Sequence, residues 1–277
     1  MLVVAGAFAT EVEVARLRPE EQSAAAAFLA AHPPGLGPPL AVVIPAFNEE
    51  RTVGEVVAAI PAEAAGLASE VIVVVDGAGD STAAQAASAG ALVCEVAVNR
   101  GQGAALRLGY WLARARGAEV IATFDADGQY EPLELERVVE PIVAGDADFV
   151  SGSRRLGIEL TTDSVRHLGV IVFGALISVL IGHRITDPAC GVRAMSAEVT
   201  ATVTLEQPQY QASELLISAA LAGFRLTEVP TTMRDRGDDT TRTKKHHNFA
   251  YGLHFGRAAI TTWIRDRRRR RRRTLES

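Results

Sequence analysis

The stretch Val71-Ile-Val-Val-Val-Asp-Gly-Ala-Gly-Asp-Ser-Thr82 is an apolar run that stops at an acid, a glycine loop and a second acid. Strands that are apolar throughout are typical of parallel sheets covered by helices on both faces. In such sheets, ligands bind beyond the carboxyl ends of the strands. We therefore expect Asp76 to lie at a ligand-binding edge, and Asp80 to be the N-cap of the next helix.

Outward from this stretch, strand-like and helix-like patterns alternate. Apolar strands separated by helices of about 10–15 residues indicate βα units and a parallel sheet. The predicted fold class is therefore α/β, with a Rossmann-like, mostly parallel sheet flanked by helices. We expect strands at 40–45, 71–75, 91–98, 120–124 and 149–150, and helices at 49–60, 81–89, 103–116 and 133–144.

Composition changes divide the chain into four regions. Residues 1–39 are an Ala-rich extension that ends in a Pro/Gly linker, and residues 40–160 carry the alternating pattern. Residues 161–263 form a second half, with helices expected at 163–182 and 212–223 and a last helix that ends near Trp263. Residues 264–277 are an Arg-rich tail.

The 277 residues have the composition of an ordinary globular protein, with 48% hydrophobic residues and a net charge of −5. The seven arginines from Arg267 to Arg273 predict a disordered tail, either solvated or in contact with anionic lipid or nucleic acid. Cys94 and Cys190 are too few for a disulfide framework or a zinc site and are interpreted as core residues. The longest apolar run, 168–181, is shorter than the roughly twenty residues of a membrane span, so it predicts a core or interfacial helix.

The segment Phe124-Asp-Ala-Asp-Gly-Gln-Tyr130 directly follows an expected buried strand. In an extended segment, alternation puts Asp125, Asp127 and Gln129 on one side. Hard oxygen ligands of this kind suit Mg²⁺ or Mn²⁺ that carries the phosphates of a substrate. The alternative is an Asx-turn with solvated acids.

The segment Asn99-Arg-Gly-Gln-Gly-Ala-Ala-Leu-Arg107 is a glycine-rich loop that enters a helix. Backbone N–H groups at a helix N-terminus favour phosphate, to which Gly103 and Arg107 would contribute. The loop does not match the dinucleotide fingerprint G-x-G-x-x-G, whose place is after the first strand. The alternative is a tight strand-to-helix turn.

Three further features fall in the second half. In Ile185-Thr-Asp-Pro-Ala-Cys-Gly-Val-Arg193, Arg193 could pair with a phosphate, or it could form a loop-shaping ion pair with Asp187. The cationic segment 234–247 predicts an anion-closing lid, or else an exposed loop. Glu214 is either a charge at a helix N-terminus or a general base.

These motifs, in this order, resemble the family 2 glycosyltransferases of GT-A fold, and within them the dolichyl-phosphate mannose synthase-like branch. The resemblance covers about residues 40–263, where 40–160 would be the nucleotide-sugar-binding half and 161–263 the acceptor side. It rests on Val43-Ile-Pro-Ala-Phe-Asn-Glu-Glu50, Asp125-Ala-Asp-Gly-Gln129, Ser151-Gly-Ser-Arg154 and Thr186-Asp-Pro-Ala-Cys-Gly-Val-Arg193.

The resemblance implies that Pro45, Phe47 and Glu49 line the nucleotide pocket, that Asp125, Asp127 and Gln129 hold the metal, and that Arg193 meets a phosphate. The residue patterns and the resemblance together give the following candidate sets. The candidate donor-binding residues are Pro45, Phe47, Glu49, Asp76, Gly103, Arg107, Asp125 and Ala126. The candidate metal ligands are Asp125, Asp127 and Gln129. The candidate acceptor and lid residues are Asp187, Arg193, Arg236, Thr241 and Arg242, and the catalytic set is Asp127, Arg193, Glu214 and Arg236.

Two departures from the family pattern stand out. Val75 occupies the position where the family usually has the first of two adjacent acids, which leaves Asp76 as the second. In the lid motif, Asp239 and Thr240 replace the usual Gly and Glu. Both departures bear on which nucleotide base the protein prefers in its donor and on which acceptor it uses.

Together, the motifs and the resemblance predict an inverting hexosyltransferase that uses Mg²⁺ or Mn²⁺ and a nucleotide-diphosphate sugar. The expected acceptor is a polyprenyl phosphate, and the expected location is cytoplasmic, with peripheral contact between the Arg tail and the inner face of an anionic membrane. The first alternative is transfer to a hydroxyl of a soluble small molecule, which would need Glu214 or Asp187 as a base. The second alternative is a non-catalytic sugar-nucleotide-binding protein. No specific nucleic-acid partner is expected.

Overall fold

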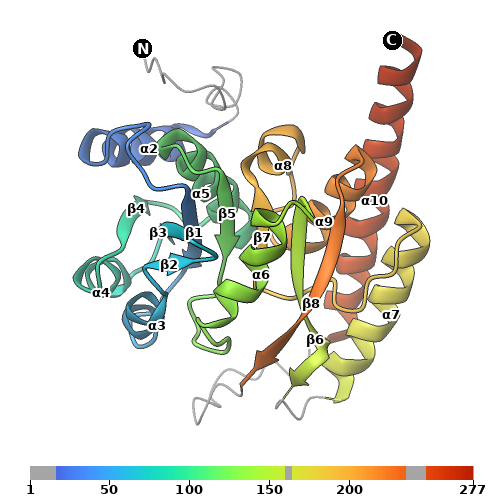
Figure 1. Cartoon of the computed structure of the whole chain (residues 1–277), viewed down its shortest axis with the longest axis horizontal. Helices are drawn as coiled ribbons and strands as arrows, with labels where there is room; N and C mark the ends of the chain where they lie inside the picture. The colour runs from blue at the N-terminus through green and yellow to red at the C-terminus, as the bar shows by residue number, and fades with distance from the viewer. Residues whose placement is uncertain (1–16, 160–163, 235–247, 277) are drawn as a thin grey trace.

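A computed structural model describes residues 17–159, 164–234 and 248–276 and shows a central sheet flanked by helices (Figure 1). The strands run in the order β4-β3-β1-β5-β7-β6-β8, and β2 forms an antiparallel hairpin with β3. The strands are β1 (Leu40–Ala46), β2 (Glu63–Ala64), β3 (Leu67–Asp76), β4 (Leu92–Val96), β5 (Val120–Thr123), β6 (Phe149–Glu159), β7 (Arg193–Ser196) and β8 (Leu226–Met233).

The prediction of a mostly parallel α/β sheet is confirmed. Strands β4, β3, β1 and β5 are mutually parallel, and β6 is parallel to β8. Strands β2, β7 and β8 are not among the predicted strands, and β7 runs antiparallel to both β5 and β6. Strand β6 is also much longer than expected, because it continues along β8 past a register shift between Ser153 and Ile158.

The predicted helices occur in the predicted order, most of them with small shifts of their ends, but α8 was not predicted and α10 continues past the expected end near Trp263. Helix α3 starts later than expected, because residues 47–52 form a loop in which Asn48 has a left-handed conformation (φ 55°). The described helices are α2 (Pro19–Ala31), α3 (Val53–Ala59), α4 (Thr82–Ser88), α5 (Gln102–Arg116), α6 (Glu134–Val143), α7 (Ser164–Ile181), α8 (Ala197–Thr202), α9 (Gln211–Ala222) and α10 (Asn248–Glu276).

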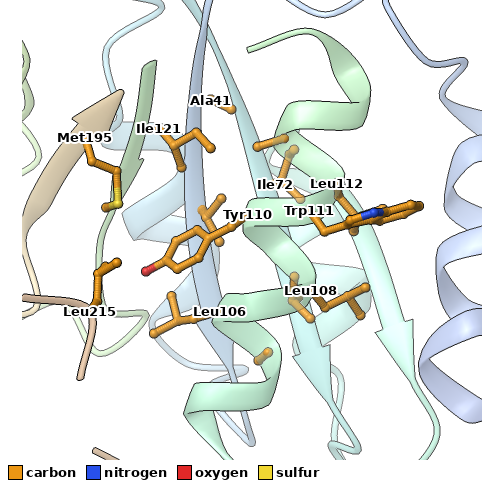
Figure 2. Close-up of a cluster of buried hydrophobic side chains, with 14 of the residues drawn as sticks. Ala41, Ile72, Leu106, Leu108, Tyr110, Trp111, Leu112, Ile121, Met195 and Leu215 are labelled. Atoms are coloured by element: carbon orange, nitrogen blue, oxygen red, sulfur yellow. The ribbon is translucent and has the colours of Figure 1, made fainter. Parts of the chain in front are cut away.

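Both faces of the sheet are buried, as the continuous apolar strands predict. Alternate residues of β1 enter two different clusters, with Val43 in one and Val42 in the other. Helix α5 covers the first face, where Leu106, Leu108, Tyr110 and Leu112 lie near sheet residues such as Ala41, Ile72 and Ile121 (Figure 2). A Cβ atom on Gly109 would lie 2.3 Å from Cγ1 of Val43, so glycine allows α5 to pack closely on the sheet.

The N-terminal region is part of this packing from residue 17 onward. Phe28 and Leu29 of α2 belong to the same cluster as α5. The linker after α2 is fixed by backbone hydrogen bonds, since the N–H of Gly35 donates to the carbonyl of Ala115 (2.9 Å) and that of Gly37 to Arg116 (2.8 Å). The linker therefore attaches α2 to the end of α5.

The expectation of a disordered arginine tail is wrong, because α10 continues through the arginine run to Glu276. Arginine is a good helix former. Side-chain contacts also oppose the repulsion within the run: Arg269 pairs with Glu206 (3.4 Å) and lies 3.8 Å from Asp266, and the guanidinium of Arg267 lies 4.7 Å from the ring centroid of Trp263.

Two smaller expectations are confirmed. Cys94 and Cys190 are buried and free of disulfide bonds. Across the described ranges, none of the helices combines the length and apolar character needed to cross a bilayer.

Candidate active site

The carboxyl ends of β1, β3 and β5 lie next to one another, because these strands are parallel neighbours. The segments that follow them start at Phe47, Gly77 and Phe124. The fold therefore brings three of the motifs to one edge of the sheet, as the sequence predicts.

The loop after β1 is held against the loop after β3. The side-chain oxygen of Asn48 accepts the N–H of Gly79 (2.9 Å), and Oγ1 of Thr82 accepts the N–H of Glu49 (2.9 Å). Pro45 is buried within β1, Glu49 is half-buried, and Phe47 remains 46% exposed. An exposed aromatic ring at this edge is available to stack on a flat ligand.

The two residues at the end of β3 point to different environments. Val75 is only 1% exposed and belongs to the apolar cluster that also contains Val53 and Ala86. Asp76 is also buried, but its carboxylate accepts the N–H groups of Arg100 (2.8 Å) and Gly101 (2.7 Å). Burial raises the pKa of Asp76, and these two hydrogen bonds partly offset that rise. Asp76 thus anchors the glycine-rich loop, and its contact with a donor remains a prediction.

Asp80 organises the start of α4 without being its N-cap, a position that Ser81 occupies. The carboxylate of Asp80 accepts the N–H of Thr82 (3.0 Å) and that of Glu50 (3.4 Å). Burial alone would raise the pKa of Asp80, but the hydrogen bonds from Thr82 and Glu50 lower it.

The glycine-rich loop packs against residues 206–208. The N–H of Gly103 donates to the carbonyl of Pro208 (2.8 Å), and Nη1 of Arg107 donates to the carbonyl of Gln207 (3.3 Å). A Cβ atom on Gly103 would lie 2.1 Å from that carbonyl oxygen of Gln207. The geometry favours the tight turn over the phosphate cradle, because Gly103 and Arg107 bind protein carbonyls.

Asp125 and Asp127 follow β5, and both are half-buried. Oδ1 of Asp125 accepts Nε2 of Gln102 (3.0 Å), which links it to the glycine-rich loop. A Cβ atom on Gly191 would lie 2.0 Å from Oδ2 of Asp125, so only glycine leaves room for this carboxylate. Oδ1 of Asp127 accepts a hydrogen bond from the N–H of Gln129 (3.1 Å). This bond forms the Asx-turn that the sequence also allows as an alternative to a metal site.

The side chain of Gln129 is buried, whereas a loop that only binds a metal ion would be expected to leave it more exposed. The side-chain Nε2 of Gln129 donates to the backbone carbonyl of Arg234 (3.2 Å), and the backbone carbonyl of Gln129 accepts a hydrogen bond from the backbone N–H of Arg234 (2.7 Å). These bonds tie the loop to the end of β8, directly before the expected lid. Ala126, between the two acids, is buried.

The residues at this edge fit a divalent cation that is shared with a substrate. No group of three or more His, Cys, Asp or Glu side chains in the described residues could hold a metal ion by itself. Mg²⁺ is usually bound by one or two carboxylates together with substrate phosphates and water. The half-buried pair Asp125 and Asp127 matches that type of site.

The loop between α7 and β7 is shaped by a different ion pair from the one considered from the sequence. Asp187 pairs with Arg154, at 2.5 Å from Nε and 2.7 Å from Nη2, and both side chains are buried. Burial alone would lower the pKa of Arg154, but the bonds and charge of Asp187 raise it. Arg193 is buried at the start of β7 and donates to the carbonyl of Cys190.

Glu214 lies in the first turn of α9 and is buried. Its carboxylate accepts the N–H groups of Glu206 (2.9 Å) and Gln207 (2.8 Å) and Nη1 of Arg265 (2.7 Å). These contacts favour the interpretation of Glu214 as a charge at a helix N-terminus over that of a general base. Sequence reasoning missed the partner Arg265, which lies 51 residues away and has no motif of its own.

The structure leaves part of the expected lid undescribed. Arg236, Thr241 and Arg242 lie outside the described residues. Arg234, directly before this segment, forms an ion pair with Glu131.

This arrangement defines a class: the mixed α/β sheet is the GT-A fold, which the chain shares with solved glycosyltransferase structures. Its solved counterparts include glucosyl-3-phosphoglycerate synthase from Mycobacterium tuberculosis, in complex with Mn²⁺, uridine diphosphate and phosphoglyceric acid. That structure has a TM-score of 0.61 and 22% identity, over 91% of this chain and 84% of the other. The profile of the family described as glycosyl transferase family 2 matches residues 41–203, and the chain belongs to this family and is a glycosyltransferase.

Two curated relatives carry more specific names. A dolichyl-phosphate hexose transferase of Haloferax volcanii is 31% identical over 230 residues, which cover 83% of this chain and 96% of the relative. An undecaprenyl-phosphate mannosyltransferase of Micrococcus luteus is 29% identical over 209 residues, which cover 70% and 83%.

Proposed function

We propose that the protein transfers a hexose from a nucleotide-diphosphate sugar to a polyprenyl phosphate, with Mg²⁺ or Mn²⁺ and with inversion at the anomeric carbon. The observation that carries the proposal is the half-buried pair Asp125 and Asp127 at the carboxyl end of β5. The names of the two curated relatives and the Mn²⁺ and uridine diphosphate in the M. tuberculosis enzyme support the acceptor class and the donor class.

In this proposal, Asp125 and Asp127 would hold the cation, whose chemistry would be to neutralise the charge that develops on the leaving diphosphate. Gln102 and Gly191 fix Asp125, the first through a hydrogen bond and the second by leaving space. Phe47 stacks on the base of the donor. Arg236 and Arg242, in the segment that follows β8, would contribute positive charge to the binding of the phosphates, as the resemblance implies.

The acceptor is inferred from the state of the two candidate bases. A phosphate acceptor is already ionised, whereas a hydroxyl acceptor must lose a proton to a base. Glu214 is held by two backbone N–H groups and Arg265, and Asp187 is held by Arg154. Both carboxylates are therefore engaged by protein partners, and recruiting either as a base would break these contacts, which favours the phosphate over the hydroxyl. A polyprenyl-phosphate acceptor would also place the protein at the cytoplasmic face of a membrane as a peripheral protein.

The test is a transfer assay with radiolabelled nucleotide sugars and Mn²⁺. Each donor is offered to a polyprenyl phosphate in detergent and, separately, to water-soluble alcohols and hydroxy acids. We expect label in the lipid phosphate, and loss of that label with EDTA or in Asp127→Asn. Label only in a hydroxyl acceptor would replace the lipid phosphate with the first alternative, and donor binding without any transfer would support the non-catalytic alternative.

A further inference from the structure

Helix α7 turns an apolar face to solvent. Leu168, Ile171, Val172 and Val179 are all exposed, Leu168 to 62% and Val179 to 82%. Their spacing puts them on one side of the helix, since residues three, four and seven apart share a face. The other side of the helix packs inward through buried residues such as Ile177.

Helix α10 extends the same flank of the molecule. The two helices lie side by side (Figure 1), with the rings of Phe173 and Phe255 4.6 Å apart and Nε1 of Trp263 donating to the carbonyl of Leu180 (2.6 Å). On α10, Ile260 and Ile264 are exposed, and the exposed arginines Arg267 to Arg271 follow one turn later.

The two kinds of side chain meet in a hollow of about 730 Å³ between the end of α7, α9 and α10. An apolar wall beside a group of guanidinium ions matches the chemistry of an amphiphile with an anionic head. The apolar lining is Val179, Leu180, Ile181, Leu221 and Trp263, and the cationic lining is Arg267, Arg270 and Arg271.

We propose that the flank formed by α7 and α10 docks on an anionic phospholipid bilayer, with both helices in the plane of the membrane. The apolar residues of α7 insert among the acyl chains, and the arginines of the hollow bind a lipid phosphate headgroup. Amphipathic helices bind membranes in this manner, through buried apolar area together with attraction to anionic lipids. The inference rests on the proposed function, because a lipid acceptor explains why the protein would bind a membrane. The observations that support it are independent of sugar transfer.

Other partners fit this surface less well. A nucleic acid would use the arginines, but it gives no reason for exposed Leu168, Val172 and Val179 beside them. A second copy could cover the apolar face, but it would bring two runs of seven arginines to the same flank, where like charges repel. A bilayer with anionic lipids offers acyl chains to the apolar residues and phosphate groups to the arginines.

The orientation is compatible with access to a lipid acceptor. Strands β5 and β6 run in the same direction, because both are antiparallel to β7 between them, and α7 begins shortly after the carboxyl end of β6. The N-terminal end of α7, where Leu168 lies, is therefore on the same edge of the sheet as the carboxyl end of β5, which Asp125 and Asp127 follow. The arginine-lined hollow lies at the other end of α7. A bilayer along this flank would therefore extend from the hollow towards the candidate active site.

The test is co-sedimentation of the full chain with vesicles of phosphatidylglycerol and phosphatidylcholine, or of phosphatidylcholine alone. We expect binding to the anionic vesicles only, and weaker binding as salt is added. Each basic residue near an anionic surface contributes about fivefold, so the triple substitution Arg267→Gln, Arg270→Gln and Arg271→Gln should weaken binding about a hundredfold. The double substitution Val172→Asp and Val179→Asp should also abolish insertion, while Leu36→Asp, at an exposed leucine of the linker, is the matched control.

Insertion has its own signal, because the chain has two tryptophans, of which Trp111 is buried and Trp263 lines the hollow. Brominated phospholipids should quench Trp263 and leave Trp111 unaffected. Lack of binding to anionic vesicles would overturn the proposal. So would quenching that survives Val172→Asp with Val179→Asp, a preference for duplex DNA over vesicles, or a lipid-free dimer that the same double substitution dissociates.

Sugar transfer provides an independent control. With a short-chain, water-soluble polyprenyl phosphate, both sets of variants should keep the activity of the unsubstituted protein. Transfer without vesicle binding would refute the docking surface and leave the proposed function intact, and vesicle binding without transfer would do the reverse.

Discussion

Arg265 of α10 and Glu214 of α9 form an ion pair with an Nη1–Oε1 distance of 2.7 Å, in which the Glu214 side chain is fully buried. The same carboxylate accepts the N–H groups of Glu206 and Gln207, and the next residue, Pro208, accepts the N–H of Gly103. A chain of contacts therefore runs from the basic helix to the glycine-rich loop, and from there through Gln102 to Asp125.

Removal of this pair should destabilise the protein. Glu214→Ala leaves the N–H groups of Glu206 and Gln207 without their acceptor and removes one of the carboxylates that bind Arg265, which keeps Asp266 and Glu206. A buried donor left unsatisfied costs about 1–3 kcal/mol. The matched control is Arg269→Gln, whose partner Glu206 is half exposed, and which should cost less than about 1 kcal/mol. Urea unfolding of both variants measures the difference, and equal midpoints would show that the pair is not structural.

Gly103→Ala should disturb the glycine-rich loop without unfolding the protein. The added methyl group would lie 2.1 Å from the carbonyl oxygen of Gln207, and overpacking of this kind typically costs about 1–3 kcal/mol. We expect lower thermal stability together with a reduced kcat/KM, since the loop carries the Gln102 contact with Asp125. Gly79→Ala is the control, because a Cβ atom there meets nothing within 4 Å. A Gly103→Ala variant with the stability and activity of Gly79→Ala would contradict the close packing.

Val75→Asp introduces an acid at the position where the family pattern of the resemblance has one, and the structure predicts that it will be poorly tolerated. Val75 is buried in an apolar cluster, so a carboxylate there would be desolvated without a partner. We expect a large drop in melting temperature, whereas Val98→Asp, at a half-exposed position, should have little effect. A folded Val75→Asp variant with altered selectivity among nucleotide donors would show instead that this side chain can reach the donor.

The two thiols should be unreactive in the native state. Burial raises the pKa of Cys94 to about 12 and that of Cys190 to about 11, so both are protonated at neutral pH. Because the native state holds these protons more tightly than the unfolded chain, the stability they contribute is present below the unfolded thiol pKa of 9.0 and is lost as the pH rises from there towards 11 and 12. Titration with a thiol reagent at pH 8 should label neither cysteine until denaturant is added, and rapid native labelling would contradict their burial.

Local patterns were sufficient to predict the parallel half of the sheet. Apolar runs such as Val71–Val75 signal buried strands whatever their partners are, and the position of an acid after a strand places it at the ligand edge. Asp125 and Asp127 were found in this way.

The remaining errors share a physical cause, which is dependence on distant partners. Strand β7 is short and begins with Arg193, so only its pairing with β5 and β6 makes it a strand. Asp187 was considered with Arg193, six residues away, but it pairs with Arg154 across 33 residues. The surroundings of Glu214 and the helical state of the arginine run depend on distant partners too, since Arg265, Glu206 and Trp263 contact them only after the chain has folded.

The central claim is that Asp125 and Asp127 hold a divalent cation on the diphosphate of the donor. Isothermal titration of uridine and guanosine diphosphates, with Mn²⁺ or with EDTA, tests it most directly. The account predicts that one nucleoside diphosphate binds only with Mn²⁺, and that Asp127→Asn weakens this binding about a hundredfold or more, because a lost metal–phosphate contact is worth several kcal/mol. Equal affinity with EDTA, or unchanged Mn²⁺-dependent binding in Asp127→Asn, would contradict it.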